Sequence, residues 1–328
     1  MQKMGFFSYL RYSIKQSLWR VLAKLFILLS PILILFVIVE YLTRYIPNSI
    51  QEKKQLFETR IKFTEVLVLG ASHALYGINP DYFSCSGFNL SNVSQSLFYD
   101  TEITMKYLDR LTRLKAVIIT IFYPSFWFEL SDSFENWRDY LYFRSYGIKY
   151  PGLKVFTLET ISYAAIYPRK LLIQFCRDPT RFTTEKLHEN GWILSPPAQD
   201  VSGIDDIAGL DRFKYHHSLV KRSNLFRNLH YLARIMAELQ KRNIKIFFVT
   251  VPVYKTYSKY IDQKIENENH RVIDELCSRY GCKYFDYSKD SRFIMSDFYD
   301  SDHLNREGAK KFSMILNKDF VSEACKTQ

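Results

Sequence analysis

Short apolar runs alternate with long amphipathic segments from residue 64 to the end of the chain, and this alternation limits the fold more than any other feature. The apolar runs, rich in Val, Ile and Phe, have the length and composition of buried strands. They lie at residues 66–69, 88–90, 116–122, 244–251 and 283–287. Helical spacing marks residues 100–114, 224–242 and 257–280, and Asn305 can cap a last helix that runs to about residue 319. Strands that alternate with long helices predict an α/β fold, in which helices cover both faces of a parallel sheet.

A second constraint comes from residues 25–39, fifteen consecutive residues without a charged side chain. With the apolar residues on either side, the segment approaches the roughly 20 residues that a helix needs to cross a bilayer. Lys24 and Glu40 bound it, and Pro31 is tolerated in membrane helices. A cleaved signal peptide and a buried helix of a soluble protein are the alternatives. The long basic segment before the run and the lack of an Ala-x-Ala-like site after it favour an uncleaved anchor at residues 21–45.

The charges around this segment predict its orientation and the order of the domains. Residues 1–24 contain five basic side chains and no acidic one. Because basic residues stay on the cytoplasmic side, we expect a single-pass protein of the cytoplasmic membrane, with its N-terminus inside and the rest outside. The expected order is a cytoplasmic basic segment at 1–20, the anchor at 21–45, a polar stalk at 46–63 and an α/β domain at 64–328. Residues 128–215 interrupt the alternation and are interpreted as an insertion in that domain, with helical character at 133–142 and 158–176.

The net charge of +11 does not indicate a nucleic-acid partner. Much of it comes from the N-terminal basic segment, and no run of Lys and Arg is interleaved with aromatic residues as a nucleic-acid face requires. The five cysteines form no Cys-x-x-Cys pair, and no histidine lies at zinc-binding spacing from them. They are therefore interpreted as small buried side chains or free thiols. A Cys277–Cys282 disulfide stays open as an alternative if the domain lies outside the cytoplasm.

Two separated stretches carry the candidate catalytic residues. Ser72 follows the strand at 66–69 in a sharp turn that begins at Gly70, and Asp300 and His303 lie between the last strand and the last helix. The carboxyl ends of parallel strands share one edge of a sheet, so these side chains are expected to meet there. A serine hydroxyl needs a base to take its proton, and the base needs a carboxylate to hold its tautomer. The sequence predicts Ser72 as the nucleophile, His303 as the base and Asp300 as the carboxylate that orients His303.

Other polar residues near these stretches are assigned no catalytic role. His73 is expected to pack or to point away, and Asp302 is interpreted as an ordinary loop acid before a helix. His216 and His217, with aspartates at 205, 206 and 211 upstream, match no metal-ligand spacing. We therefore predict neither a metal site nor a cofactor.

Both stretches resemble the motif blocks of the SGNH (GDSL-like) hydrolase superfamily. The sequence LVLGASHALYGINP has Ser72 at the nucleophile position, and DSDHLNREGAKKF has Asp300 and His303 at the Asp-x-x-His positions. The resemblance covers about residues 64–321 and implies a flavodoxin-like three-layer α/β/α sandwich with ester or acyl-transfer chemistry. The N-terminal anchor and the form of the motifs are similar to membrane-tethered members, which act on cell-surface polysaccharides or teichoic acids, often beside a membrane-bound O-acyltransferase.

The chain departs from the family pattern at the blocks that usually complete the oxyanion hole. The second block, FNLSNVSQSLFYD, has no glycine after Phe88, and the third block, IFYPSFWF, lacks the Gly-x-Asn motif. In their place we expect the backbone N–H groups of Ser72 and of Ser94 or its neighbour, and the side chain of Asn92. The resemblance then implies a serine esterase or O-acyltransferase that acts on acyl esters of extracytoplasmic glycans through an acyl-serine intermediate.

A non-catalytic role is the alternative that the missing glycine and asparagine leave open. In that case the domain would bind a glycan or assemble with a membrane acyltransferase. Aromatic residues in the middle of the chain would then stack on sugars, although packing in the core is the interpretation we favour for them. They are Phe126, Trp127, Trp137, Tyr140 and Tyr142.

Overall fold

The computed structural model describes residues 6–46, 48–177, 187–194 and 204–326, with only the backbone at residues 6–13, 171 and 175–176. The chain divides into two compact units. Met1–Pro47 and Thr157–Pro179 make the N-terminal unit, and Asn48–Phe156 and Thr180–Gln328 make the α/β unit. The stretch predicted as one insertion at 128–215 is therefore divided between the two units.

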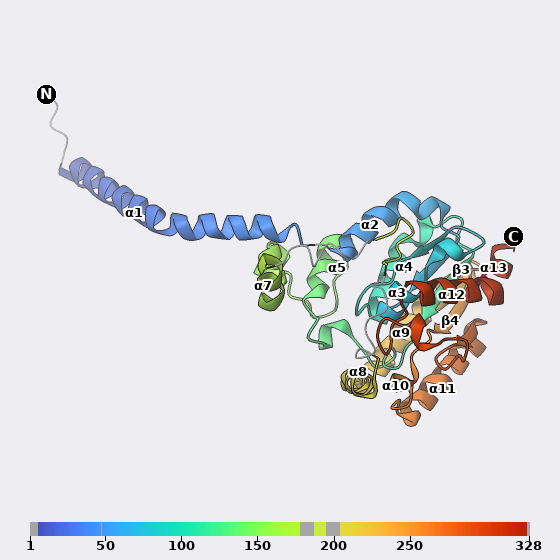
Figure 1. Cartoon of the computed structure of the whole chain (residues 1–328). Helices are drawn as coiled ribbons and strands as arrows, with labels where there is room; N and C mark the ends of the chain where they lie inside the picture. Colours follow the sequence, from blue (N-terminus) through green and yellow to red (C-terminus); the bar gives the residue numbers. More distant parts are fainter. Residues whose placement is uncertain (1–5, 47, 178–186, 195–203, 327–328) are drawn as a thin grey trace. The chain divides into compact units, whose positions relative to one another are not determined.

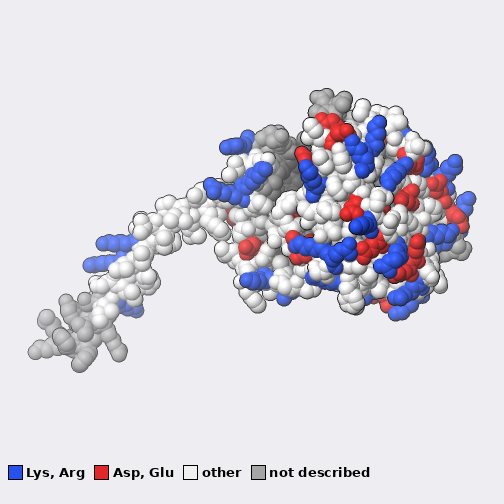
Figure 2. Space-filling view, turned by 90° about the horizontal axis from the view of Figure 1, so that it is seen from below, with Lys and Arg blue, Asp and Glu red and all other residues white. Residues whose placement is uncertain are grey.

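The N-terminal unit is built on helix α1 (Phe6–Thr43). Residues Ile14–Thr43 of this helix form a segment that is long and apolar enough to cross a membrane. No other helix among the described residues has such a segment. Most of the apolar side chains along this stretch are exposed. Figure 2 shows the middle of the helix without Lys, Arg, Asp or Glu side chains. Helix α1 contains most of the predicted anchor at 21–45 and begins inside the predicted basic segment at 1–20.

Three short helices complete the described part of this unit: η5 (Leu158–Thr160), α6 (Tyr163–Ile166) and α7 (Arg169–Arg177). The single helical stretch predicted at 158–176 is interrupted at Pro168, because the residue before a proline disfavours the helical conformation and Tyr167 is extended. The Glu40 carboxylate of α1 accepts hydrogen bonds from Ser162 Oγ (2.8 Å) and from the backbone N–H of Ala164 (3.2 Å). These bonds hold the start of α6 against the end of α1.

The α/β unit contains a five-stranded parallel sheet with the strand order β2-β1-β3-β4-β5. The interior strands β1 and β3 are buried along their whole length, which accounts for their continuous Val, Leu and Ile runs. Each apolar run predicted as a strand forms one. The strands are β1 (Val66–Leu69), β2 (Gly87–Asn89), β3 (Ala116–Thr120), β4 (Lys245–Thr250) and β5 (Lys283–Asp286).

Helices cover both faces of this sheet (Figure 1). On one face, Val68 and Ile118 pack with Phe312 of helix α12 (Arg306–Leu316), which Asn305 caps as predicted. The opposite layer contains α4 (Leu97–Tyr107), α9 (Leu225–Lys241) and α11 (Gln263–Tyr280). Helix α9 lies against both α4 and α11 and contacts β4, and α11 contacts β5. The predicted three-layer α/β/α sandwich with a parallel sheet is confirmed.

The prediction of a polar stalk at residues 46–63 is wrong. Most of it is helix α2 (Ser49–Arg60), which belongs to the α/β unit and packs against α5 (Arg138–Tyr146). Lys53 on the inner face of α2 is buried, and its Nζ donates to the carbonyl oxygen of Ser91 just after β2. The outer face carries the charged residues that give the segment the composition of a stalk.

Two disulfides join Cys85 to Cys325 and Cys277 to Cys282, with Cα–Cα distances of 5.9 and 4.4 Å. The interpretation of these cysteines as free thiols is therefore wrong, and the Cys277–Cys282 alternative is correct. The Cys85–Cys325 bond connects residues 240 positions apart, a pairing that sequence spacing cannot reveal. The side chain of Cys176 lies outside the described part of the structure.

Candidate active site

The turn after β1 presents Ser72 at the start of the short helix α3 (Ser72–Gly77). Gly70 occupies a backbone conformation with φ +134°, and a Cβ atom there would lie 1.9 Å from Thr120 Oγ1. Only glycine allows β1 to turn so close to β3. The Gly70 N–H donates to Asp100 Oδ1 (3.0 Å), and its carbonyl oxygen accepts from the Asn92 N–H (3.2 Å). The turn that carries Ser72 is therefore fixed on both sides.

The loop before α12 supplies the other two predicted residues. Asp300 Oδ1 accepts hydrogen bonds from the backbone N–H groups of Asp302 (3.0 Å) and His303 (2.7 Å), so the carboxylate folds back over its own loop. Asp300 Oδ2 lies 2.9 Å from His303 Nδ1. On the other side of the ring, His303 Nε2 lies 2.8 Å from Ser72 Oγ. The structure brings the three predicted residues into the Ser–His–Asp arrangement of a serine hydrolase.

A cavity of about 330 Å³ has Ser72, Asp300 and His303 in its wall. Much of the remaining wall is aromatic, and Arg212 and Glu135 are the other charged residues that line it. The aromatic side chains are Tyr76, Phe122, Phe128, Phe134, Tyr215 and Tyr299. A cavity of this size holds a small acyl group and part of an alcohol, while a polymer would have to extend beyond it.

Two backbone N–H groups can form an oxyanion hole in this cavity. Ser94 has φ +54°, the left-handed conformation that glycine adopts most readily, and it lines the cavity together with Ser72. Within the described residues, neither the Ser72 N–H nor the Ser94 N–H has a hydrogen-bond acceptor. Asn92 does not line the cavity, and its Oδ1 accepts from Ser49 Oγ (2.9 Å) and from the Val93 N–H (3.0 Å). The structure therefore favours Ser94 over the Asn92 side chain as the second donor.

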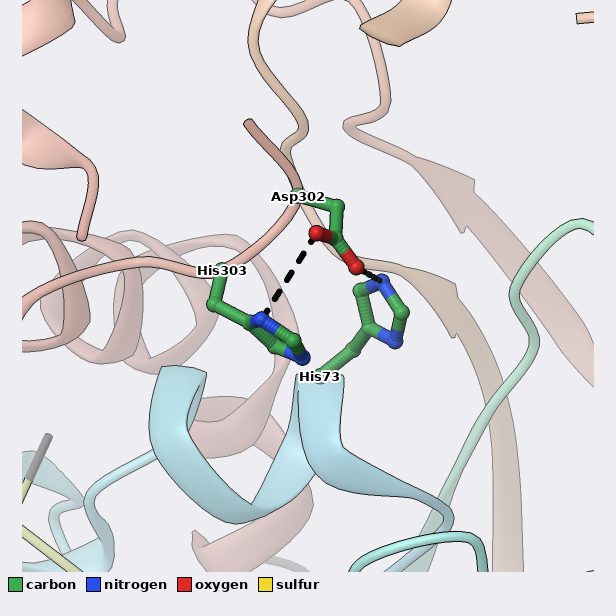
Figure 3. A group of neighbouring side chains, drawn as sticks. All are labelled: His73, Asp302 and His303. Carbon is green, nitrogen blue, oxygen red and sulfur yellow. Dashed lines mark ion pairs between the residues drawn. The ribbon is translucent and has the colours of Figure 1, made fainter. Parts of the chain in front are cut away.

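A buried carboxylate, Asp302, lies behind the proposed triad. Figure 3 shows it between the imidazole rings of His73 and His303. Asp302 Oδ1 accepts from Arg212 Nε (2.8 Å), and Oδ2 lies 3.3 Å from His73 Nε2 and 3.8 Å from His216 Nε2. With 0% of its surface exposed, Asp302 is not the ordinary loop acid that the sequence predicts. His73 packs as predicted, with its ring stacked on Phe122.

The residues that surround Asp302 come partly from helix α8 (Asp206–Ser218), in a region that the sequence does not resolve into elements. Arg212 and His216 lie four positions apart on this helix and so share one face. The N-cap Asp205, whose side chain accepts from the Ala208 N–H, is the one local sign of the helix in the sequence. No spacing rule connects an Arg on this helix to an Asp 90 residues later.

Burial and charge act in opposite directions on the groups of this cluster. Burial by itself would raise the pKa of Asp302, but the positive charge of His303 in its protonated form and that of Arg212 outweigh it and hold that pKa well below its usual value. Burial also lowers the pKa of His73 and that of His216, so both rings stay neutral. Burial would lower the pKa of His303 as well, but Asp302 and Asp300 outweigh it and raise that pKa.

His73, Asp302 and His303 offer nitrogen and oxygen atoms within 4.8 Å of one another, a spacing that a metal ion can bridge. Two observations favour an ion-pair network instead. Arg212 already pairs with the carboxylate, and both ring nitrogens of His303 already face other partners. His216 Nδ1 faces Tyr257 Oη (2.8 Å), so that histidine, too, is held by a hydrogen bond.

The chain matches a protein family model, and it is similar to six chains among the solved structures. A family model described as DltD protein matches residues 212–311, a stretch that contains Arg212, Asp300 and His303. A putative acylhydrolase from Bacteroides fragilis has a TM-score of 0.40 and 10% identity, over 83% of this chain and 97% of its own. A GDSL-like lipase from Bacteroides thetaiotaomicron has a TM-score of 0.39 and 10% identity, over 83% of this chain and 98% of its own. No curated protein sequence matches the chain.

The family match, the fold and the side-chain geometry agree. The matched stretch includes the Asp-x-x-His block, the sheet is parallel and covered on both faces, and a serine at the end of β1 meets the histidine of that block. The chain is therefore similar to the DltD family over residues 212–311, and its fold and side-chain geometry agree with its resemblance to the SGNH (GDSL-like) superfamily.

Proposed function

We propose that this protein is a membrane-anchored serine esterase or O-acyltransferase that forms an acyl-enzyme on Ser72. The observation that carries the proposal is the position of His303, with Nε2 2.8 Å from Ser72 Oγ and Nδ1 2.9 Å from Asp300 Oδ2. In this geometry Nε2 can take the serine proton, while the hydrogen bond between Nδ1–H and Asp300 holds the ring in the correct tautomer.

The first half of the reaction transfers the acyl group to the enzyme. His303 Nε2 takes the proton of Ser72 Oγ as that oxygen bonds to the carbonyl carbon of the ester. The carbonyl oxygen becomes an oxyanion, and the backbone N–H groups of Ser72 and Ser94 donate to it. The intermediate then collapses, the bond from carbon to the alcohol oxygen breaks, and the alcohol leaves with the proton from His303.

The second half of the reaction frees the enzyme. Water or a sugar hydroxyl gives its proton to His303 Nε2 as its oxygen attacks the carbonyl carbon of acyl-Ser72. The bond to Ser72 Oγ breaks and that oxygen takes the proton back. Water gives hydrolysis and a sugar hydroxyl gives transfer, so the shape of the cavity and the access of water decide between the two outcomes.

The proposed substrate is an acyl ester of a cell-surface polysaccharide or similar glycan, with a membrane-bound O-acyltransferase as a partner. Three features support this setting: the match to the DltD family model, the membrane-spanning potential of α1 and the two disulfides. Disulfides persist in oxidising compartments, which fits an α/β unit outside the cytoplasm and an N-terminus inside it.

A non-catalytic glycan-binding or assembly role is the second candidate. The observation that favours it is the lack of the family's Gly and Asn donors, since the side chain of Asn92 does not line the cavity. The aromatic residues considered for sugar stacking argue against it, because Phe126, Trp127 and Tyr142 are buried in the core.

Trapping with a fluorophosphonate separates the two candidates. The reagent forms a stable bond with an activated serine, so the enzyme proposal expects labelling of the wild type on the peptide that contains Ser72. Ser72→Ala should abolish labelling and His303→Gln should slow it by several orders of magnitude. Ser218→Ala, which changes an exposed serine outside the cavity, serves as the control and should label like the wild type. A wild type that does not label, or labelling that persists in Ser72→Ala, would contradict the enzyme proposal.

A further inference from the structure

His303 faces two carboxylates rather than one. Asp300 makes the hydrogen bond to Nδ1, and Asp302 Oδ1 lies 3.7 Å from the same nitrogen, beyond hydrogen-bond range. The two differ in environment, since the side chain of Asp300 is 27% exposed and that of Asp302 is fully buried. A triad needs only the first of these carboxylates, so the second requires its own explanation.

The other groups around His303 determine the local charge. From α3 come Ser72, the neutral ring of His73 and the ring of Tyr76, which lies nearly perpendicular to that of His303. From α8 come Arg212 and the neutral ring of His216, which is tied to Tyr257 of α10 (Lys255–Ser258). The charged groups in the cluster are therefore two carboxylates and one guanidinium. While His303 is neutral, the cluster therefore carries one net negative charge. The imidazolium that forms on His303 during acylation balances it.

We propose, on the basis of the function proposed above, that Asp302 is a positioning residue that stabilises the protonated form of His303, and that Arg212 limits this stabilisation. Because Asp302 is shielded from water, its attraction for the imidazolium is weakly screened. Arg212 holds Asp302 in place through Nε and at the same time opposes the positive charge on His303. Burial would lower the pKa of His303, but the charges of Asp302 and Asp300 outweigh it and raise that pKa, in agreement with this arrangement.

A purely structural role for the pair is the competing explanation. In that case the Arg212–Asp302 bond would only hold α8 against the loop before α12. Loss of either residue would then loosen the site in the same way, and both variants would lose activity in the same direction. The electrostatic role predicts opposite shifts instead, because one variant removes a negative charge and the other removes a positive charge.

The test measures the pKa of His303 by NMR in the full-length protein with labelled histidines, its signal assigned through His303→Gln. Asp302→Asn should lower this pKa by about one unit or more, and Arg212→Gln should raise it by a similar amount. The double variant, which removes both charges, should lie near the wild type and remains a test if Asp302→Asn alone does not fold. Asp297→Asn is the matched control, because Asp297 is also buried and paired with a cation, Lys311, yet lies outside the cluster.

The rate of fluorophosphonate labelling gives an independent reading of the same change. Only neutral His303 can accept the serine proton, so the rate falls as the pH drops through the pKa of His303. The acid limb of the rate profile should therefore move to lower pH in Asp302→Asn and to higher pH in Arg212→Gln. A His303 pKa that stays unchanged, or that moves the same way in both single variants, overturns the role proposed for Asp302.

The NMR measurement does not depend on catalysis, so the two proposals can fail separately. Opposite pKa shifts without labelling of wild-type Ser72 would support the electrostatic cluster and contradict the esterase or acyltransferase. Labelling of Ser72 without opposite shifts in the pKa of His303 would support the enzyme proposal and would mean that Asp302 has only a structural role.

Discussion

His303 Nε2 lies 2.8 Å from Ser72 Oγ although 231 residues separate the two in the sequence. The parallel sheet explains how they meet. Ser72 follows the carboxyl end of β1, and the chain from the carboxyl end of β5 leads to His303, so both residues reach the same edge of the sheet. The position of each residue is then fixed locally, by Gly70 on one side and by Asp300 on the other.

Asp300→Asn tests the orientation of His303. The asparagine oxygen can still accept the backbone N–H groups of Asp302 and His303, so the loop should keep its shape. Its amide nitrogen, in the place of Oδ2, cannot accept a hydrogen bond from Nδ1–H, so the ring is no longer held in its correct tautomer. We expect the labelling rate to fall by about 10⁴-fold with a small change in the melting temperature. A rate within about tenfold of the wild type would contradict the role of Asp300.

Gly70→Ala tests the turn that presents Ser72. The added Cβ would lie 1.9 Å from Thr120 Oγ1, in a backbone conformation at φ +134° that alanine disfavours. We expect a loss of about 2–4 kcal/mol in the free energy of unfolding and a strong loss of labelling. Gly147→Ala is the matched control, because Gly147 also has positive φ but nothing lies within 4 Å of the added Cβ. It should cost about 1 kcal/mol and leave labelling unchanged. Equal costs in chemical denaturation would contradict the proposed clash.

The strands and the three proposed catalytic residues could be predicted from sequence because their signals are local. Buried parallel strands are continuous apolar runs, and the Asp-x-x-His spacing by itself allows a carboxylate to reach Nδ1. The partners of Asp302 could not be predicted in this way. Arg212 and His73 meet it only through the packing of α8 and α3 against the last loop, and no sequence period describes that packing.

Helix α2 shows a different limit of sequence analysis. Because charged residues dominate the segment, its composition predicts a polar stalk. Lys53 is nevertheless buried, and its ammonium donates a hydrogen bond to the carbonyl oxygen of Ser91. A lysine can bury its stem and bond buried carbonyls, so polar composition alone does not exclude packing. The Cys85–Cys325 disulfide cannot be predicted from sequence for a related reason, since only the fold brings its two cysteines together.

Lys53→Met tests the packing of α2. The variant leaves the carbonyl oxygens of Asn89 and Ser91 without the buried donor that they share. We expect a loss of about 1–3 kcal/mol in the free energy of unfolding, measured by urea denaturation. Lys62→Met, an exposed change just after α2, should stay within about 0.5 kcal/mol of the wild type. A segment that acts as a free stalk would show no difference between the two variants.

The two disulfides should differ in their effect on stability. Cys85–Cys325 closes a loop of 240 residues and Cys277–Cys282 a loop of 5, so the first restricts the unfolded chain far more. Chain entropy gives about 5 kcal/mol for the first bond and about 2 kcal/mol for the second. We expect Cys85→Ser with Cys325→Ser to lower the melting temperature more than Cys277→Ser with Cys282→Ser. Thiol trapping in intact cells should find both pairs oxidised, and reduced cysteines there would contradict an extracytoplasmic α/β unit.

Asp100 predicts a dependence of stability on pH. Burial raises the pKa of this carboxyl to about 7, despite hydrogen bonds from Gln95 Nε2 and from the Gly70 N–H. The folded protein therefore keeps a proton on Asp100 that the unfolded chain loses near pH 4. This group favours the folded state at low pH, and the stabilisation is lost as the pH rises toward 7. Asp100→Asn removes the titration, and its oxygen can still accept both hydrogen bonds. We expect the stability of the variant relative to the wild type to rise between pH 4 and pH 8, by up to about 4 kcal/mol in urea denaturation. Asp81→Asn, a change at an exposed aspartate, serves as the control. If the stability of Asp100→Asn relative to the wild type did not change with pH, Asp100 would already be ionised in the folded protein at pH 4.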